Sequence, residues 1–108
     1  KYISGTPLDM AKAYALKGLA LYKQGKPTMA FVDLNNSEFY AKNDADFIAS
    51  FYAQAAYYAL QNKEPIAIRY LRLAIEKGFV DKQKLTADVD FNNIKNSAAF
   101  HDLVSKIR

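Results

Sequence analysis

The sequence predicts an all-α protein that forms a single domain over residues 1–108. Apolar residues recur at intervals of three and four over several long stretches, which is the spacing of amphipathic helices. The alternation of apolar and polar residues that marks a half-buried strand is absent throughout the chain. The chain has only four glycines and three prolines, which fits long helices joined by few turns. A chain of this length has room for one compact domain and not for two ordinary ones.

Residues 48–78 are expected to form the hairpin around which the chain is organised. One helix should run over about 45–62 from an N-cap at Asp44, and it is almost uncharged, so it should be the central helix. The polar residues 61–65 turn the chain into a second helix over about 64–77, and Gly78 is its expected C-terminal cap. The expected inward set of this second helix is Ile66, Ala67, Tyr70, Leu71, Ala74 and Ile75.

The first forty residues predict a similar hairpin. A helix should start at Thr6, Pro7 and Asp9 and end near Gln24, because Thr6 can act as an N-cap and Pro7 suits a first turn. Its expected inward set is Ala11, Tyr14, Gly18, Leu21 and Tyr22. A second helix over about 27–41 should turn inward Ala30, Phe31, Leu34 and Phe39. A glycine inside a helix costs about 1 kcal/mol relative to alanine, so Gly18 indicates a close helix crossing.

The residues after Gly78 predict shorter elements. Asp81 should cap a short helix over 82–87, and the Asp- and Asn-rich residues 88–94 should form turns. Ser97 should cap a last helix over about 97–107. Its apolar residues at helical spacing are Phe100, Leu103, Val104 and Ile107.

The two hairpins look like copies of one unit. When the two hairpins are aligned at an offset of 37 positions, large residues align with large ones and small residues with small ones. The matching pairs are Tyr14 and Phe51, Gly18 and Ala55, Leu21 and Tyr58, Ala30 and Ala67, and Leu34 and Leu71. Small residues let two antiparallel helices approach each other, and flanking aromatic side chains fill the space beside them.

This pattern resembles the tetratricopeptide repeat (TPR) family. The resemblance covers about residues 11–78, with repeat one over 11–44 and repeat two over 48–78, and Ala74 matches a small position near the end of repeat two. Ser37 departs from the family's last small position in repeat one, and neither repeat ends in the expected proline. The resemblance implies a right-handed α-α superhelix. Residues 79–108 are similar to the closing segment of many bacterial TPR proteins and should form a capping helix.

TPR stacks use the first helix of each hairpin to line a concave groove, so the resemblance implies a non-enzymatic scaffold that binds a protein or peptide segment there. The expected groove residues are Lys12, Leu16, Leu19, Tyr22, Lys23, Tyr52 and Ala56, beside Ala49, Ala53 and Ala59. They describe an apolar floor with lysines on one rim, suited to a segment with acidic flanks. An alternative is that the capping segment or a partner fills this surface. The residues of the family's carboxylate clamp are missing, which argues against chaperone tails as ligands.

No residue set predicts catalysis, a cofactor or a metal. There is no cysteine, and His101 is the only histidine, so a zinc site or a nucleophile–base pair has little to build on. Asp81, Asp88 and Asp90 lack the spacing of a calcium loop and are interpreted as caps and turns. No Gly-rich phosphate loop or nucleophile elbow is present. We therefore expect that the protein is not an enzyme.

The net charge of +4 lies entirely within residues 1–30. This leaves nucleic-acid binding through Lys12, Lys17, Lys23 and Lys26 as a less favoured alternative to a solvated face. No apolar run reaches the length of a membrane span, so we expect a soluble protein, cytoplasmic or exported. The chain starts with Lys1, which indicates a processed product or a regulatory or adaptor domain excised from a larger protein. Two repeats are fewer than a free-standing solenoid usually needs, so a longer array or self-association through the first helix is a further alternative.

Overall fold

The computed structural model describes residues 9–107, and this part of the chain is all-α with no strand. The first five α-helices of this part are α1 (Met10–Lys23), α2 (Pro27–Phe39), α3 (Asp44–Leu60), α4 (Glu64–Glu76) and α5 (Lys82–Ala87). A 3₁₀ turn, η1 (Val89–Phe91), and a last helix, α6 (Ala98–Ser105), follow. The all-α prediction is confirmed. The expected helix start at Thr6 and Pro7 lies outside the described residues.

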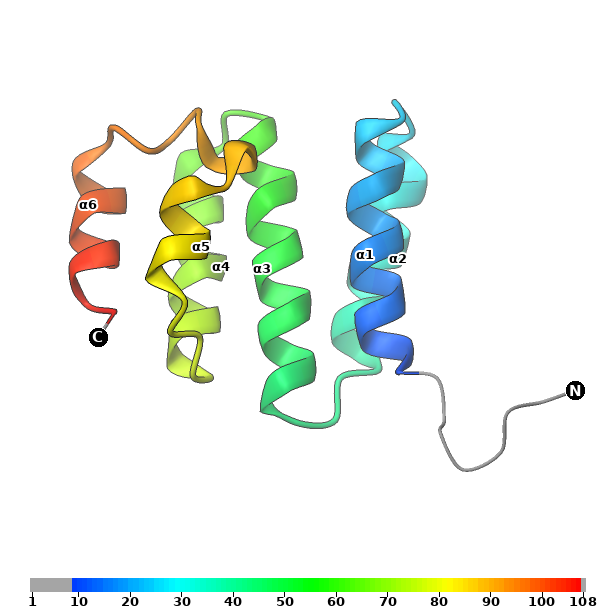
Figure 1. The fold of residues 1–108 in the computed structure, drawn as a ribbon. Helices are drawn as coiled ribbons and strands as arrows, with labels where there is room; N and C mark the ends of the chain where they lie inside the picture. Colours follow the sequence, from blue (N-terminus) through cyan, green and yellow to red (C-terminus); the bar gives the residue numbers. More distant parts are fainter. Residues whose placement is uncertain (1–8, 108) are drawn as a thin grey trace, which may run out of the picture.

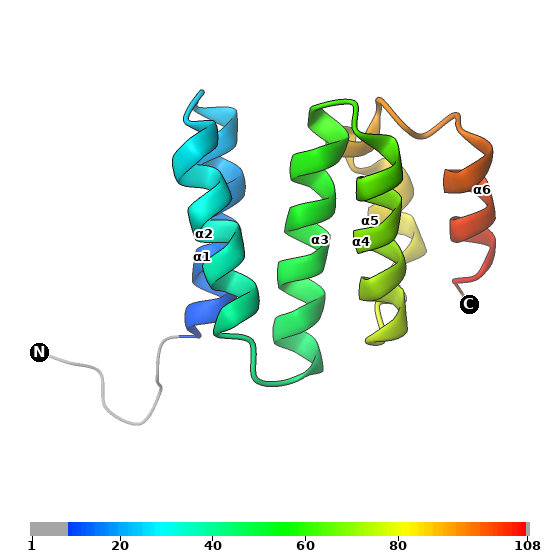
Figure 2. The same cartoon turned by 180° about the vertical axis from the view of Figure 1, so that it is seen from behind.

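The helices form two neighbouring hairpins followed by a tail. Figure 1 shows α1 in front of α2 and α5 in front of α4, with α3 between the first hairpin and these two helices. The reverse view in Figure 2 shows α2 and α4 in front, and α6 at the end of the molecule opposite the first hairpin. Helix α3 packs against α1, α2, α4 and η1. The expectation that it is the central helix is confirmed.

The core has two parts that meet at α3. The larger part joins α3 and α4 to the tail, and the smaller one joins α1 and α2 to α3. The tail contributes several almost fully buried side chains to the larger part: Phe79, Leu85, Phe91, Ile94, Phe100, Leu103 and Ile107. The residues after Gly78 therefore belong to the same folded unit as the second hairpin.

Gly18 lies at the close crossing that its position in the sequence predicts. A Cβ atom added there would lie 2.8 Å from Cγ and 2.9 Å from Cδ2 of Leu34. These distances are shorter than any ordinary carbon–carbon contact, so α2 can approach α1 this closely only because residue 18 has no side chain.

Three helices end in the same left-handed turn. Gly25, Asn62 and Gly78 have φ values of 83°, 61° and 114°. At each turn, this residue donates its N–H to the third carbonyl back, and the next residue donates to the fifth carbonyl back. This pair of bonds is the Schellman motif. The expected cap at Gly78 is confirmed.

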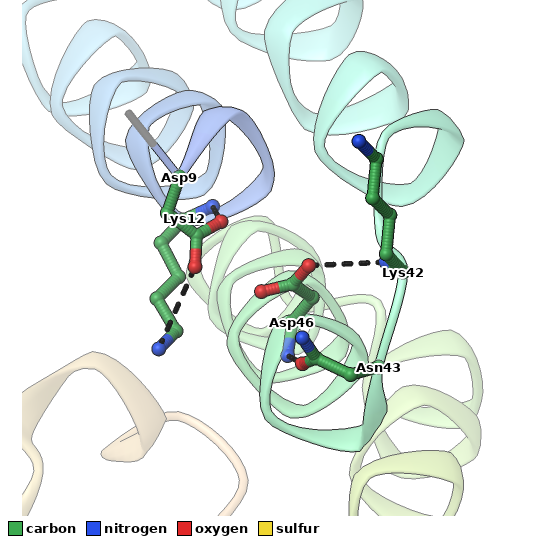
Figure 3. A network of polar contacts seen from close by, with 5 residues as sticks. All are labelled: Asp9, Lys12, Lys42, Asn43 and Asp46. Atoms are coloured by element: carbon green, nitrogen blue, oxygen red, sulfur yellow. Dashed lines mark hydrogen bonds and ion pairs between the residues drawn. The ribbon is translucent and has the colours of Figure 1, made fainter. Parts of the chain in front are cut away.

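Several sequence-based assignments need correction. The N-cap of α3 is Asn43 rather than Asp44, because its side chain accepts the N–H of Asp46. Asp9 is itself the N-cap of α1. Figure 3 shows both helix starts, with Asp46 also accepting the N–H of Lys42 at 3.0 Å. The caps expected at Asp81 and Ser97 are confirmed.

The inward face of α2 was also predicted wrongly in part. Phe31 and Phe39 are 48% and 77% exposed. Two polar residues are buried instead, Asp33 and Ser37. The Oγ atoms of Ser37 and of Ser50 on α3 lie 2.6 Å apart. These short side chains let α2 and α3 come close together, whereas an aromatic ring at position 37 would push the two helices apart. In α1 and α4, the expected residues Tyr14, Tyr22, Ile66, Tyr70 and Ile75 are only half-buried, whereas Ala15 and Ile68 lie deeper.

Candidate functional site: a groove between α1, α3 and α5

An open groove of about 400 Å³ lies between α1, α3 and the segment that carries α5 and η1. These three elements stand next to one another in the front layer of Figure 1. The residues that line the groove are Lys12, Ala15, Leu16, Leu19, Ile48, Ala49, Tyr52, Ala53, Phe79, Lys84, Asp88 and Asp90.

The lining of the groove is mainly apolar. On α1 the groove is lined by Leu16, which is 77% exposed, and by half-buried Leu19. On α3, Ala49 and Ala53 face the same space. Because alanine side chains are short, the two helices leave a hollow between them here instead of filling it. A large side chain such as Leu16, left mostly in water beside an apolar hollow, indicates a surface that another molecule can cover.

Tyr52 forms the wall of the groove nearest the tail. Its ring packs on Phe79 and Phe91 with centroids 5.2 Å and 5.3 Å away. Its hydroxyl donates to Oδ2 of Asp88 at 2.7 Å, and Nζ of Lys84 lies 5.1 Å from its ring centroid. Burial raises the pKa of Tyr52 well above its ordinary value, and the hydrogen bond to Asp88 raises it further. Tyr52 is therefore a neutral hydrogen-bonding wall at physiological pH.

The rim carries charges of both signs. Nζ of Lys23 lies 2.9 Å from Oδ2 of Asp90, and Nζ of Lys12 lies 3.6 Å from Oδ2 of Asp9. Asp88 accepts the N–H of Asp90, so the two tail carboxylates are held at the same end of the groove. The expectation of a rim formed by lysines is thus incomplete, because acidic side chains from the tail lie among them.

The structure gathers some of the expected site residues and separates others. Lys12, Leu16, Leu19 and Tyr52 line the groove. The ring of Tyr22 packs edge-to-face on Tyr57 at 5.2 Å and belongs to the smaller core. Lys23 lies at the groove end through its ion pair with Asp90 rather than in the lining.

Two alanines were assigned to the groove wrongly. Ala56 and Ala59 have no exposed surface and lie in the core. The reason is that α3 is surrounded by neighbours, and these two residues face α4 and the tail. Conversely, helical periodicity did not indicate that the tail contributes to the groove, through Phe79, Lys84, Asp88 and Asp90. The signal in the sequence was the Asp88–Val89–Asp90 turn, but helical periodicity says nothing about where such a turn lies.

No metal-binding cluster accompanies the groove in the described part of the chain. Within residues 9–107, no three or more His, Cys, Asp or Glu side chains are grouped so that they could hold a metal ion. Asp81 and Asp88 accept backbone N–H groups, which confirms their interpretation as caps and turns. His101 is exposed and lines a separate open pocket of about 320 Å³ beside α6. None of the described helices combines the length and the apolar character that a membrane span requires.

Comparison of the chain with protein-family models, with curated proteins and with solved structures finds no match.

Proposed function

We propose that this protein is a non-enzymatic interaction module that binds a protein or peptide segment in the groove between α1, α3 and α5. The observation that carries this proposal is the exposure of Leu16, 77%, at the edge of an apolar hollow whose walls are packed and hydrogen-bonded. A hollow of about 400 Å³ falls within the range of ligand-binding clefts, roughly 300–1,000 Å³.

The chemistry of the groove indicates the kind of segment. The apolar lining suits one or two bulky apolar side chains, which would cover Leu16 and the alanines of α3. The rim offers Lys12 and Lys84 as cations and Asp88 and Asp90 as carboxylates. A segment with an apolar centre and polar flanks of both signs therefore fits better than one with acidic flanks alone.

The fold supports the proposal through the repeat. We propose that the two hairpins are TPR-like repeats that begin a right-handed α-α superhelix, with the tail as its cap. In support, three of the five matched pairs are buried in both hairpins: Gly18 and Ala55, Ala30 and Ala67, Leu34 and Leu71. In the other two pairs, one member, Tyr14 or Tyr58, is only half-buried. In such a stack the first helices of the hairpins line the concave face, and here α1 and α3 line the groove.

The test is selection of binders from a library of random peptides displayed against the immobilised chain, followed by affinity measurement. Leu16→Glu should weaken selected peptides about tenfold or more, because it places a charge in the apolar part of the groove. Phe39→Glu is the matched control, because Phe39 is also 77% exposed but lies on α2. Peptides that bind Leu16→Glu as tightly as wild type, or a library that yields no binder, would argue against the groove as the site.

Nucleic-acid binding is less well supported. Three of the four lysines expected to carry it pair with carboxylates, Lys12 with Asp9, Lys17 with Asp33 and Lys23 with Asp90. Each pairing reduces the charge available for phosphates. Affinity for RNA or DNA that falls steeply with salt would favour this alternative instead. A role as a regulatory or adaptor domain of a larger protein is compatible with the groove and would use the same surface.

A further inference from the structure

We propose that the protein self-associates through the face of the first hairpin that points away from α3, and that the occupant of this face is the same face of a second copy. We call it the N-terminal face and define it by six residues: Met10, Ala13, Lys17 and Ala20 of α1, and Met29 and Val32 of α2. This face lies on a different side of α1 from the groove, so the inference does not depend on the proposed function.

The internal repeat indicates that this face is a helix-packing surface. Three residues of α3 contact the first hairpin through hydrogen bonds or ring packing: Ser50, Gln54 and Tyr57. The repeat offset of 37 positions places their equivalents on Ala13, Lys17 and Ala20. The second hairpin buries these positions against the first. On the first hairpin, Lys17 and Ala20 are exposed and Ala13 is half-buried.

Larger apolar side chains surround these positions. Met10, Met29 and Val32 are 41%, 53% and 52% exposed. Met10, Ala13, Tyr14 and Lys17 also form a shallow open hollow of about 170 Å³. A surface with unpaired apolar side chains on both helices of a hairpin is typical of an interface between subunits.

The two ends of the molecule differ, and this difference points to a two-fold contact. At the other end α6 packs on α4 and buries Phe100 and Leu103, so that end presents no open hairpin face on which the N-terminal face of another copy could stack. A head-to-tail contact is therefore blocked, whereas the N-terminal face can meet itself across a two-fold axis.

The charges on the N-terminal face suit such a contact. Nζ of Lys17 lies 3.7 Å from Oδ2 of Asp33, and Lys17 is 63% exposed. The Asp33 side chain beside the face is only 12% exposed, so the cation of the face is already paired within its own chain. Two copies can therefore meet without bringing unpaired like charges together.

The experiment is sedimentation equilibrium or multi-angle light scattering of the 108-residue chain from low micromolar to near-millimolar concentration. We expect the mass to rise with concentration to twice that of one chain. Val32→Glu and Ala20→Glu, which place charges on α2 and on α1 of the same face, should each weaken association about a hundredfold or more. Both positions are exposed, so circular dichroism should show both variants folded.

Leu16→Glu is the control, because it changes an exposed residue of α1 on the groove side. It should associate like wild type. A wild-type chain that remains monomeric over the whole range would overturn the proposal and would leave the face to a hairpin of another protein. A dimer that Leu16→Glu abolishes while Val32→Glu and Ala20→Glu do not would also overturn it, by moving the interface to the groove.

Discussion

Lys23 and Asp90 are separated by 67 positions in the chain, yet their Nζ and Oδ2 atoms lie 2.9 Å apart. Lys23 stands at the end of α1 and Asp90 in η1, so the pair joins the first helix to a segment that follows both hairpins. The Asp90 side chain is only 11% exposed, whereas that of Lys23 is 50% exposed. Because Asp90 lines the groove, the pair links the groove to the end of α1 and ties the position of the tail to the first hairpin.

Lys23→Glu should destabilise the fold, because it removes the partner of a mostly buried carboxylate and adds a second negative charge beside it. We expect a loss of about 1–2 kcal/mol in the free energy of unfolding, measured by urea denaturation. Lys26→Glu makes the same charge change at an exposed position of the next turn and should cost less than about 0.5 kcal/mol. Equal losses in the two variants would show that net charge, and not the pair with Asp90, is responsible.

Gly18→Ala should destabilise the fold even though alanine is the better helix former. The new methyl group would meet Leu34 at less than 3 Å, and overpacking of this kind costs about 1–3 kcal/mol. Combining Gly18→Ala with Leu34→Ala should restore part of the loss, because the second change removes the atoms that clash. A double-mutant cycle of unfolding free energies measures this coupling. If the losses of unfolding free energy from Gly18→Ala and Leu34→Ala simply add in the double variant, the close contact between residues 18 and 34 would be contradicted.

Much of the fold was predictable because it depends on local chemistry. Helical periodicity indicated the helices, and the residues Gly78, Asp81 and Ser97 showed where three of them end or begin. The inward face of α2 was not predictable from hydrophobicity. Ser37 becomes an acceptable buried residue only because Ser50 of α3 lies 2.6 Å from it, and Ser50 is bonded in turn to Gln54. Such a partner exists only in the folded structure.

The groove was predictable to a similar extent. Comparison of the repeats assigned Leu16, Leu19 and Tyr52 to one surface, and in the structure all three line the groove. The same comparison failed for Ala56, because a small residue on a helix with neighbours on several sides can be either a groove floor or core. The contribution of Asp88 depends on the path of the tail, which irregular turns determine and periodicity does not reveal.

Tyr52 should make the stability of the protein fall in alkaline solution. Burial, and then the hydrogen bond to Asp88, raise its pKa in the folded state, whereas the unfolded tyrosine ionises near its ordinary value of about 10. Above that pH the unfolded state therefore binds fewer protons than the folded state. The contribution of Tyr52 is complete below about pH 10 and declines as the pH rises further.

Tyr52→Phe should reduce this alkaline decline, and at neutral pH it should cost about 1–2 kcal/mol through the lost hydrogen bond. Urea denaturation at several pH values from 7 upward measures both effects. Asp88→Asn is an informative comparison, because it keeps the tyrosine but removes the negative charge of the acceptor, and we expect a decline between those of wild type and Tyr52→Phe. An unchanged decline in Tyr52→Phe would assign it to other groups.

The three left-handed turns allow a comparison of how much stability is lost when a residue other than glycine has to adopt a positive φ. Asn62 has φ 61° in the position that glycine occupies in the other two turns. Asn62→Gly should leave stability unchanged or raise it by about 0.5 kcal/mol, because glycine adopts this conformation without steric cost. Gly25→Ala should lower stability by about 1 kcal/mol through the backbone alone, since its Cβ would meet nothing within 4 Å. Thermal and urea unfolding of the two variants measure this difference, and a Gly25→Ala protein as stable as wild type would mean that this turn does not hold the end of α1.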